Sequence, residues 1–240
     1  MLWLILGLAG VEEQVWGEAL RAHVSLEGVD YAAIGPTGLD PYLAQLASAD
    51  LSSASQAEKM AFWINAYNAL TVDMIAENQG IDSIRDLDGG KVWDKRTFTV
   101  AGKQVSLNDI EHGTLRPMGD ARVHAALNCA SKGCPPLPLK PVTAANLEAD
   151  LDAAARQWVA TNAWVVQDEQ IALNKIFDWY GEDFVPKYGE LHDVPGVSGK
   201  KQAALNFIAV HAPNLGLAST AKNPGVKVVF GDYDWGVNRR

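Results

Sequence analysis

The stretch SQAEKMAFWINAYNALTVDMIAEN, residues 55–78, decides how the rest of this 240-residue chain folds. It begins with Ser55 and Glu58, which have the spacing of a capping box, where each side chain accepts a hydrogen bond from a free backbone N–H of the first turn. Residues that suit a core then recur every three or four positions: Met60, Trp63, Ile64, Tyr67, Thr71 and Ile75. Gly80 marks the end of the pattern. We therefore predict a long helix over residues 56–78 with one buried face.

The segments around this helix predict further helices and short strands that do not alternate regularly. Apolar spacing and capping residues indicate helices over residues 12–24, from residue 40 onward, and over 108–116, 143–160, 175–184 and 198–211. Period-two patterns indicate hairpins of 97–100 with 103–107 and of 164–167 with 170–173, and strands over 123–129 and 226–230. A doubly wound sheet needs regular alternation of strands and helices. The sequence instead predicts one α+β domain over residues 12–240, helix-rich, with a small, mostly antiparallel sheet.

The N-terminal run MLWLILGLAG, residues 1–10, is apolar and uncharged. It is too short to span a bilayer. Its length and small residues match the hydrophobic region of a secretory signal, although the positive residues that usually precede such a region are missing. We expect residues 1–11 to be the remnant of a signal and the protein to be exported, to the periplasm in a bacterium. The alternative is a buried first segment of the domain.

The composition limits the classes of partner. The chain is 48% apolar and 20% charged, which are values of a globular protein, and its formal net charge is −9. Nucleic acid and anionic membrane surfaces require a basic footprint, so neither is an expected partner. Eight tryptophans predict an aromatic core and an aromatic-lined cleft for a small-molecule or peptide ligand. No phosphate-binding loop or other cofactor motif is present, so we expect no cofactor, and no pattern sets an oligomeric state.

Reactive side chains concentrate in RVHAALNCASKGCPPLPL, residues 122–139, which holds His124 and both cysteines, Cys129 and Cys134. Four residues separate the cysteines, a spacing of neither zinc knuckles nor thioredoxins. In an exported protein such a pair most simply forms a local disulfide. Alternatively, Cys129 is a nucleophile with His112 or His124 as its base. A metal site is the weakest interpretation because no second ligand pair has the expected spacing, so we expect no metal.

Two further clusters carry polar chemistry. Asp109, His112 and Arg116 are three and four residues apart on the expected helix 108–116, which places them on one face. Such a row can orient a general base or bind a carboxylate or phosphate, and the competing interpretation is an ordinary solvated helix face. On the long helix, Asn65 and Asn68 lie beside the apolar face. Buried amides must be hydrogen-bonded, so they either fix a loop or face a polar cleft.

Four ordered motifs resemble the domain-of-unknown-function family 547. They are EKMAFWINAYNAL from residue 58, SLNDIEHGTLRP from 106, VHAALNCAS from 123 with CPPL from 134, and YDWGVN from 233. The resemblance extends from about Trp16 to the C-terminus. It implies no established activity, and exported bacterial proteins are among the family's members. Its motif positions fall on polar and aromatic residues, which indicates a site: Asn65, Tyr67, Asn68, Asp109, Glu111, His112, Arg116, His124, Asn128, Cys129, Cys134, Asp234, Trp235 and Asn238.

Three hypotheses of function follow. The first is an exported thiol-dependent hydrolase or acyl transferase. In it Cys129 is the nucleophile, His112 or His124 the base and Asp109 its orienting group, while Asn128 or Asn65 stabilises an oxyanion.

The second hypothesis is a non-catalytic periplasmic domain, in which a Cys129–Cys134 disulfide closes a loop over a cleft for an anionic small molecule. The residues expected to bind the ligand are Arg116, His112, Asn65, Tyr67, Asn68, Asn128, Asp234 and Trp235. The third hypothesis is thiol–disulfide exchange. The prolines after Cys134 argue against it, because they remove the helix N-terminus that stabilises a thiolate in such proteins.

Overall fold

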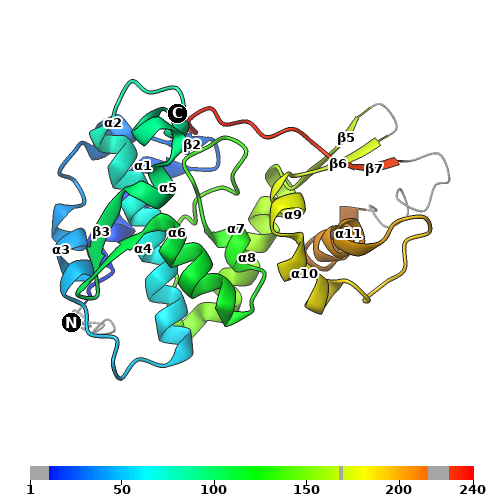
Figure 1. Cartoon of the computed structure of the whole chain (residues 1–240), viewed down its shortest axis with the longest axis horizontal. Helices are drawn as coiled ribbons and strands as arrows, with labels where there is room; N and C mark the ends of the chain where they lie inside the picture. Colours follow the sequence, from blue (N-terminus) through cyan, green and yellow to red (C-terminus); the bar gives the residue numbers. More distant parts are fainter. Residues whose placement is uncertain (1–10, 168–169, 216–226) are drawn as a thin grey trace.

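The predicted long helix forms the centre of the larger part of the molecule (Figure 1). In this computed structural model, which describes residues 11–167, 170–215 and 227–240, helix α4 spans Gln56–Glu77. The capping box at Ser55 and Glu58 is present, which confirms the prediction. All residues from Met60 to Ala76 are buried, not only one face. The helix is therefore packed on every side, and the rest of the larger part surrounds it.

The segments before and after α4 build this surrounding layer. On the N-terminal side these are α1 (Gln14–His23), β1 (Val24–Ser25), β2 (Gly28–Val29), α2 (Tyr31–Ile34) and α3 (Asp40–Ser48). On the C-terminal side they are a 3-10 segment (Ile84–Gly90), α5 (Val92–Lys95), β3 (Thr97–Val100), β4 (Lys103–Ser106) and α6 (Leu107–Ile110). Strands β3 and β4 pair antiparallel, with Val100 opposite Lys103. This confirms the first predicted hairpin, whose turn is Ala101–Gly102.

Helix α6 continues without a break into irregular helix. A π-helix spans Glu111–Leu115, and a 3-10 turn, Arg116–Met118, follows it. After α7 (Val123–Ala126) and a long loop come a 3-10 turn (Ala144–Asn146) and α8 (Leu147–Thr161). The π-helix is wider than an α-helix, and such turns are frequently found at functional sites.

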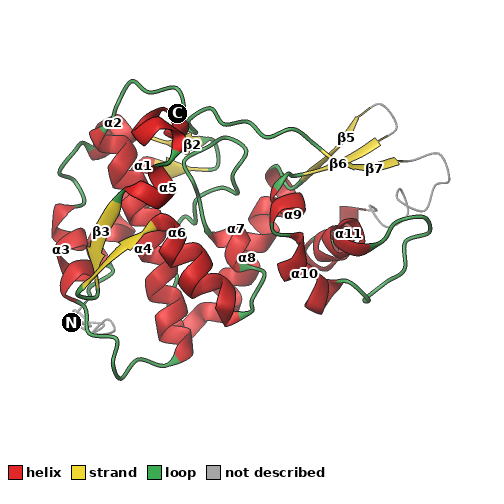
Figure 2. Cartoon of the chain, in the orientation of Figure 1, coloured by secondary structure: helices red, strands yellow, loops and turns green. Residues whose placement is uncertain are grey.

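The smaller part of the molecule holds the last helices and a three-stranded sheet, drawn in yellow in Figure 2. Its elements are β5 (Trp164–Gln167), β6 (Gln170–Leu173), α9 (Ile176–Trp179), α10 (Gly181–Tyr188), α11 (Gly199–His211), a 3-10 turn (Pro213–Leu215) and β7 (Lys227–Phe230). The sheet order is β5-β6-β7, with β5–β6 antiparallel and β6–β7 parallel. The second hairpin is confirmed, although its turn, residues 168–169, lies outside the described residues, as does Val226 of the last predicted strand.

An aromatic core joins the two parts. Trp158 of α8 stacks on Phe177 of α9 at 4.6 Å between ring centroids, and Phe184 of α10 meets Phe207 of α11 edge-on at 5.2 Å. All four side chains are fully buried. Aromatic pairs of this kind stabilise a fold beyond the area they bury. The helices and small sheets together confirm the predicted helix-rich α+β class.

The strand predicted over residues 123–129 is wrong. Residues 123–126 form helix α7 and Leu127 then becomes extended. All residues from Val123 to Asn128 are buried. The alternation of apolar and polar residue types therefore does not correspond to one buried and one exposed face. The backbone groups that would pair with a neighbouring strand are hydrogen-bonded to the side chain of Asn68 instead. This side chain donates to the Ala126 carbonyl at 2.8 Å and accepts from Asn128 N–H at 2.9 Å.

The C-terminal tail returns from the small sheet to the larger part and ends beside β2 (Figure 1). It forms isolated β-bridges on the way, pairing Ser83 with Gly236, Ser131 with Val237 and Val29 with Arg239. Segments from the beginning, middle and end of the chain therefore meet along the tail. Among the described residues, no helix combines the length and the apolar character needed to cross a membrane.

Candidate functional site

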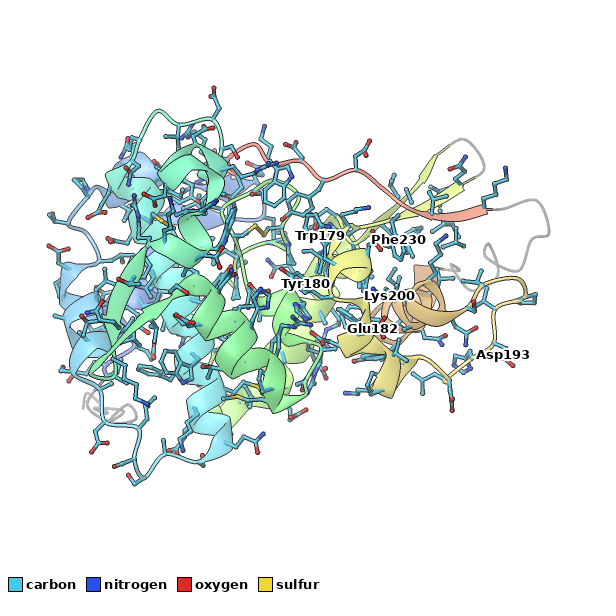
Figure 3. All side chains as sticks on the ribbon, viewed as in Figure 1. Trp179, Tyr180, Glu182, Asp193, Lys200 and Phe230 are labelled. Carbon is cyan, nitrogen blue, oxygen red and sulfur yellow. A yellow bond between two sulfur atoms is a disulfide. The ribbon has the colours of Figure 1, made fainter. Side chains whose placement is uncertain are left out.

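A pocket of about 360 Å³ opens where the larger part, the α9–α10 region and the C-terminal tail meet. This volume lies within the range of small-molecule sites. Figure 3 shows two of its residues, Trp179 and Tyr180, between the helices of the two parts. Six of the lining residues are aromatic: Tyr67, Trp93, Trp179, Tyr180, Tyr233 and Trp235. The others are Asp94, Asn108, Glu111, His112, His124, Leu127, Cys129, Cys134 and Ile176.

The π-helix supplies one acid and one imidazole of the pocket, Glu111 and His112. Glu111 is only 7% exposed and lies against two tyrosine hydroxyls, those of Tyr67 and Tyr180. Burial raises the pKa of both tyrosines, and the neighbouring Glu111 carboxylate raises it further. Both hydroxyls therefore stay protonated beside the carboxylate.

Asp183, in the first turn of α10, connects the second imidazole to an arginine. Its Oδ2 lies 2.7 Å from Nε2 of His124, while Arg116 donates from Nε to Oδ2 at 2.6 Å and from Nη2 to Oδ1 at 3.0 Å. Nη1 of Arg116 also lies 3.1 Å from Nδ1 of His112. Burial alone would raise the pKa of Asp183, but the hydrogen bonds from His124 and Arg116 outweigh it and hold that pKa below its usual range.

The two imidazoles are also held by aromatic contacts. The ring of His124 stacks on Tyr180, with centroids 4.6 Å apart and planes at 11°. The guanidinium of Arg116 also lies over the Tyr180 ring, 5.1 Å from its centroid. Nδ1 of His124 is 4.0 Å from Oε1 of Glu111, so this imidazole lies between two carboxylates, Glu111 and Asp183.

Cys129 and Cys134 form a disulfide, with their Cα atoms 6.1 Å apart. The disulfide lies in the pocket wall and contacts Tyr233, whose hydroxyl is 3.1 Å from each sulfur. Cys129 N–H also donates to Sγ of Cys134 at 2.9 Å. The chain turns between the two cysteines, where Cys134 N–H donates to the Ser131 carbonyl at 3.0 Å.

The tail places Tyr233 against this loop. Lys132 N–H donates to the Gly236 carbonyl at 2.7 Å, and Gly133 N–H donates to the Asp234 carbonyl at 2.8 Å. A side chain at Gly133 would not fit, because a Cβ there would lie 2.9 Å from the Tyr233 ring. The close approach of ring and loop therefore depends on glycine at position 133.

The structure does not bring all three predicted helix-face residues together. His112 and Arg116 are in contact, but Asp109 caps the helix: its carboxylate accepts from Ser106 N–H at 2.8 Å and from the Ser106 hydroxyl at 2.9 Å. These hydrogen bonds lower the pKa of Asp109. The carboxylate that holds an imidazole of the pocket is Asp183, which comes from another helix.

The amides assigned to ligand binding are occupied by protein groups. Asn65 bonds both backbone groups of Val142, at 2.8 and 3.0 Å. Asn68 bonds Ala126 and Asn128 as described above. Asn128 in turn donates to the Pro135 carbonyl at 2.7 Å and accepts from Ala130 N–H at 2.9 Å. These contacts fix the loops around α4.

Some of the remaining predicted site residues line the pocket, and the others make structural contacts outside it. Tyr67, His112, His124, Trp235 and both cysteines line the pocket. Arg116 does not line it and is paired with Asp183, and Asp234 accepts from Gly236 N–H at 2.8 Å to shape the tail.

Sequence reasoning assigned no role to several residues that matter here: Glu111, Asp183, Trp93, Trp179, Tyr180 and Tyr233. Glu111 and Tyr233 fall within the quoted motifs, so the motifs could have identified them as candidate site residues. No sequence pattern identified Asp183, because an acid in the first turn of a helix is ordinarily explained by the helix dipole. Among the described residues, no group of three or more His, Cys, Asp or Glu side chains is placed to hold a metal ion.

The fold and site define a helix-rich α+β domain with an aromatic pocket and a disulfide in the pocket wall. Residues 51–159 match the model of the family described as "Protein of unknown function, DUF547", so this segment of the chain is similar to that family. The matched segment is shorter than the resemblance read from the sequence. It contains α4, the π-helix and the disulfide, while Tyr180, Asp183 and Tyr233 lie beyond it. Comparison with curated proteins and with solved structures gave no match.

Proposed function

We propose that this protein binds a small organic cation in the aromatic pocket, with the ammonium or guanidinium group directed to Glu111. The observation that carries the proposal is a buried carboxylate in a pocket with six aromatic lining residues. Aromatic faces attract cations, and this attraction is strongest where water is excluded. The carboxylate supplies the counter-charge and selects a cation over a neutral group of the same shape.

The molecule already uses its aromatic rings in this way. The guanidinium of Arg85 lies 5.0 Å from the centroid of Trp235, and that of Arg116 lies 5.1 Å from the centroid of Tyr180. Apart from the two histidines, the ionisable Asp and Glu residues that line the pocket are Asp94 and Glu111, and no Lys or Arg of the described residues lines it. The expectation of an anionic ligand rested on Arg116, whose charge is neutralised by Asp183. A cation therefore suits the pocket better than an anion.

The proposal is tested by titrating the protein with choline and with 3,3-dimethylbutan-1-ol, its neutral isostere. Tryptophan fluorescence reports binding because Trp93, Trp179 and Trp235 line the pocket. We expect choline to bind at least about tenfold more tightly than the alcohol, and Glu111→Gln to remove this preference. Glu182→Gln is the matched control, because this acid carries a side chain 74% exposed outside the pocket. Equal binding of the two probes, or tighter binding of benzoate, contradicts the proposal.

A thiol-dependent hydrolase or acyl transferase is the second candidate function, and one observation favours it: Cys129, His112 and His124 line the same pocket. In the disulfide form Cys129 has no thiol to act as nucleophile, and Tyr233, not an imidazole, bonds its sulfur. Iodoacetamide labelling without reductant is the test. Alkylation of Cys129 in the native protein supports this function, and quantitative recovery of the disulfide removes the nucleophile.

Export is a proposal supported by the disulfide, because such bonds persist in oxidising compartments. We expect the protein in the periplasmic fraction of cells that produce it naturally. Recovery in the cytosol with both thiols reduced would contradict export.

A further inference from the structure

The Cys129–Cys134 disulfide is accessible from the pocket, unlike a bond in a packed core. Both cysteines line the pocket. Cys129 is half-buried, whereas Cys134 is 6% exposed. A molecule that enters the pocket therefore reaches Cys129 first, and the two sulfurs are not equivalent toward an attacking group.

Cys134 is the sulfur that the protein can stabilise as a thiolate. Its Sγ accepts from Cys129 N–H at 2.9 Å and from the Tyr233 hydroxyl at 3.1 Å. Hydrogen bonds to an ionised acceptor are about twice as strong as those to a neutral one, so both contacts would strengthen if this sulfur became negative. These two donors take the place of the helix N-terminus whose absence argued against exchange in the sequence.

The loop between the cysteines does not depend on the disulfide for its position. The tail holds Lys132 N–H and Gly133 N–H, as described above. Two asparagine side chains bind its carbonyl groups: Asn162 donates to the Cys134 carbonyl at 2.8 Å, and Asn174 donates to the Gly133 carbonyl at 2.9 Å. A disulfide across so short a loop also removes less entropy from the unfolded chain than one that closes a long loop. The bond can therefore open while the site keeps its shape.

We propose that this disulfide is a site of thiol–disulfide exchange with a small thiol or a cysteine-containing peptide. The thiolate of the incoming molecule attacks Sγ of Cys129 and forms a mixed disulfide there. The Cys129–Cys134 bond breaks, and its electron pair leaves on Cys134 as a thiolate. A second thiolate then attacks the incoming sulfur of the mixed disulfide, which releases an oxidised dimer of the thiol and leaves Cys129 as a thiolate. Two thiols are oxidised and one disulfide is reduced.

The test uses glutathione as the thiol and the full-length native protein. After brief incubation, acid quenching and digestion, mass spectrometry locates the glutathione adduct. We expect it on Cys129 and not on Cys134. Exchange must also proceed without denaturant. A native disulfide that reacts only after unfolding, or an adduct on Cys134, overturns the proposal, and both readouts come from the wild-type chain.

Tyr233→Phe tests the stabilisation of the leaving sulfur, because it removes the hydroxyl and keeps the ring. We expect exchange to slow about tenfold through loss of one hydrogen bond to the thiolate. Tyr188→Phe is the matched control, since its hydroxyl lies near His211 and contacts no sulfur. An unchanged exchange rate in Tyr233→Phe contradicts the assigned role of the hydroxyl.

Gly133→Ala offers an independent second variant, because its methyl group would displace the Tyr233 ring. Gly113→Ala is its control, with no neighbour within 4 Å of the added Cβ. We expect the first to slow exchange and the second to leave the rate unchanged. The proposal does not rest on a cationic ligand, so failure of choline to bind leaves it standing.

Discussion

Arg116 and Arg122 are six residues apart, and each pairs with carboxylates, but their surroundings differ. The Arg122 side chain is 5% exposed and contacts three acids: Asp120 at 2.6 Å, Glu148 at 2.7 Å and Asp152 at 2.7 Å. These contacts join α7 to α8. None of the four residues lines the aromatic pocket. The guanidinium is saturated with protein partners, so this cluster has the properties of a structural ion network.

Arg116 is 29% exposed and contacts one acid, Asp183, which it shares with His124. Its other polar contact is with His112, and both imidazoles line the pocket. The comparison shows that a buried ion pair is not by itself a sign of a site. What distinguishes the two clusters is whether the groups they hold face a cavity.

The largest effect in this comparison is expected for the structural cluster. Arg122→Ala leaves Asp120 without its main partner in a half-buried position, and we expect the free energy of unfolding to fall by about 3 kcal/mol. Urea denaturation measures this. Choline affinity of the folded fraction should not change. Arg96→Ala, which removes an exposed pair with Asp88, should cost less than about 1 kcal/mol. Equal losses in the two variants would show that the Arg122 cluster is not structural.

The second prediction concerns His211, a buried residue near the same cluster. Burial lowers the pKa of His211 from 6.5 to about 4, and the charge of Arg122 also lowers it. Between these pH values the unfolded chain binds a proton that the folded protein does not. The contribution of His211 to the free energy of unfolding is therefore fully present above about pH 6.5. It falls as the pH decreases to about 4, by at most about 1.4 kcal/mol per pH unit.

His211→Gln should flatten this part of the stability curve, measured by denaturation at several pH values. Replacement of the exposed His192 by Gln should leave the slope unchanged.

The third prediction returns to the pocket. Asp183→Asn removes the negative charge that neutralises Arg116 and leaves a positive charge beside the aromatic wall. We expect choline affinity to fall about tenfold, a change of about 1.4 kcal/mol, measured by tryptophan fluorescence. Glu182→Gln, one residue away and exposed, is the control. An unchanged affinity would show that Asp183 does not set the charge of the pocket.

The lowered pKa of Asp183 also predicts that the stability of the protein depends on pH in the acid range. Because its folded pKa lies below the unfolded value of about 4, the folded protein binds fewer protons than the unfolded chain in this range. Its contribution to stability is present above about pH 4 and is lost as the pH falls below that value. Asp183→Asn should remove this part of the acid dependence.

The smallest effect is expected for the partner of Asp183. Arg116→Met removes a half-exposed pair, so stability should fall by less than about 1 kcal/mol. The uncompensated Asp183 should strengthen choline binding about threefold, opposite in sign to Asp183→Asn. If Arg116 instead binds an anionic ligand, this variant weakens benzoate binding and leaves choline unchanged. The pair of variants therefore separates the two ligand classes.

Local patterns in the sequence were sufficient for much of the fold. The capping box at Ser55 and Glu58, both hairpins and the helix-rich α+β class are all present in the structure. These features depend on contacts between residues close in sequence. The strand over residues 123–129 failed because the partner of its backbone groups is Asn68, about 60 residues away. Alternation of small apolar residues cannot report a segment that is buried on every side.

The sequence by itself placed His124, Cys129 and Cys134 in one short reactive stretch, residues 122–139, because these side chains are close along the chain. It also determined the long central helix. Only the tertiary structure decided which charges matter: Asp109 caps its own helix, while Asp183 holds the imidazole and neutralises Arg116. It likewise brought Tyr233 onto the sulfurs from about 100 residues away. The physical reason is that hydrogen bonds and ion pairs form across space, whereas sequence patterns record only neighbours along the chain.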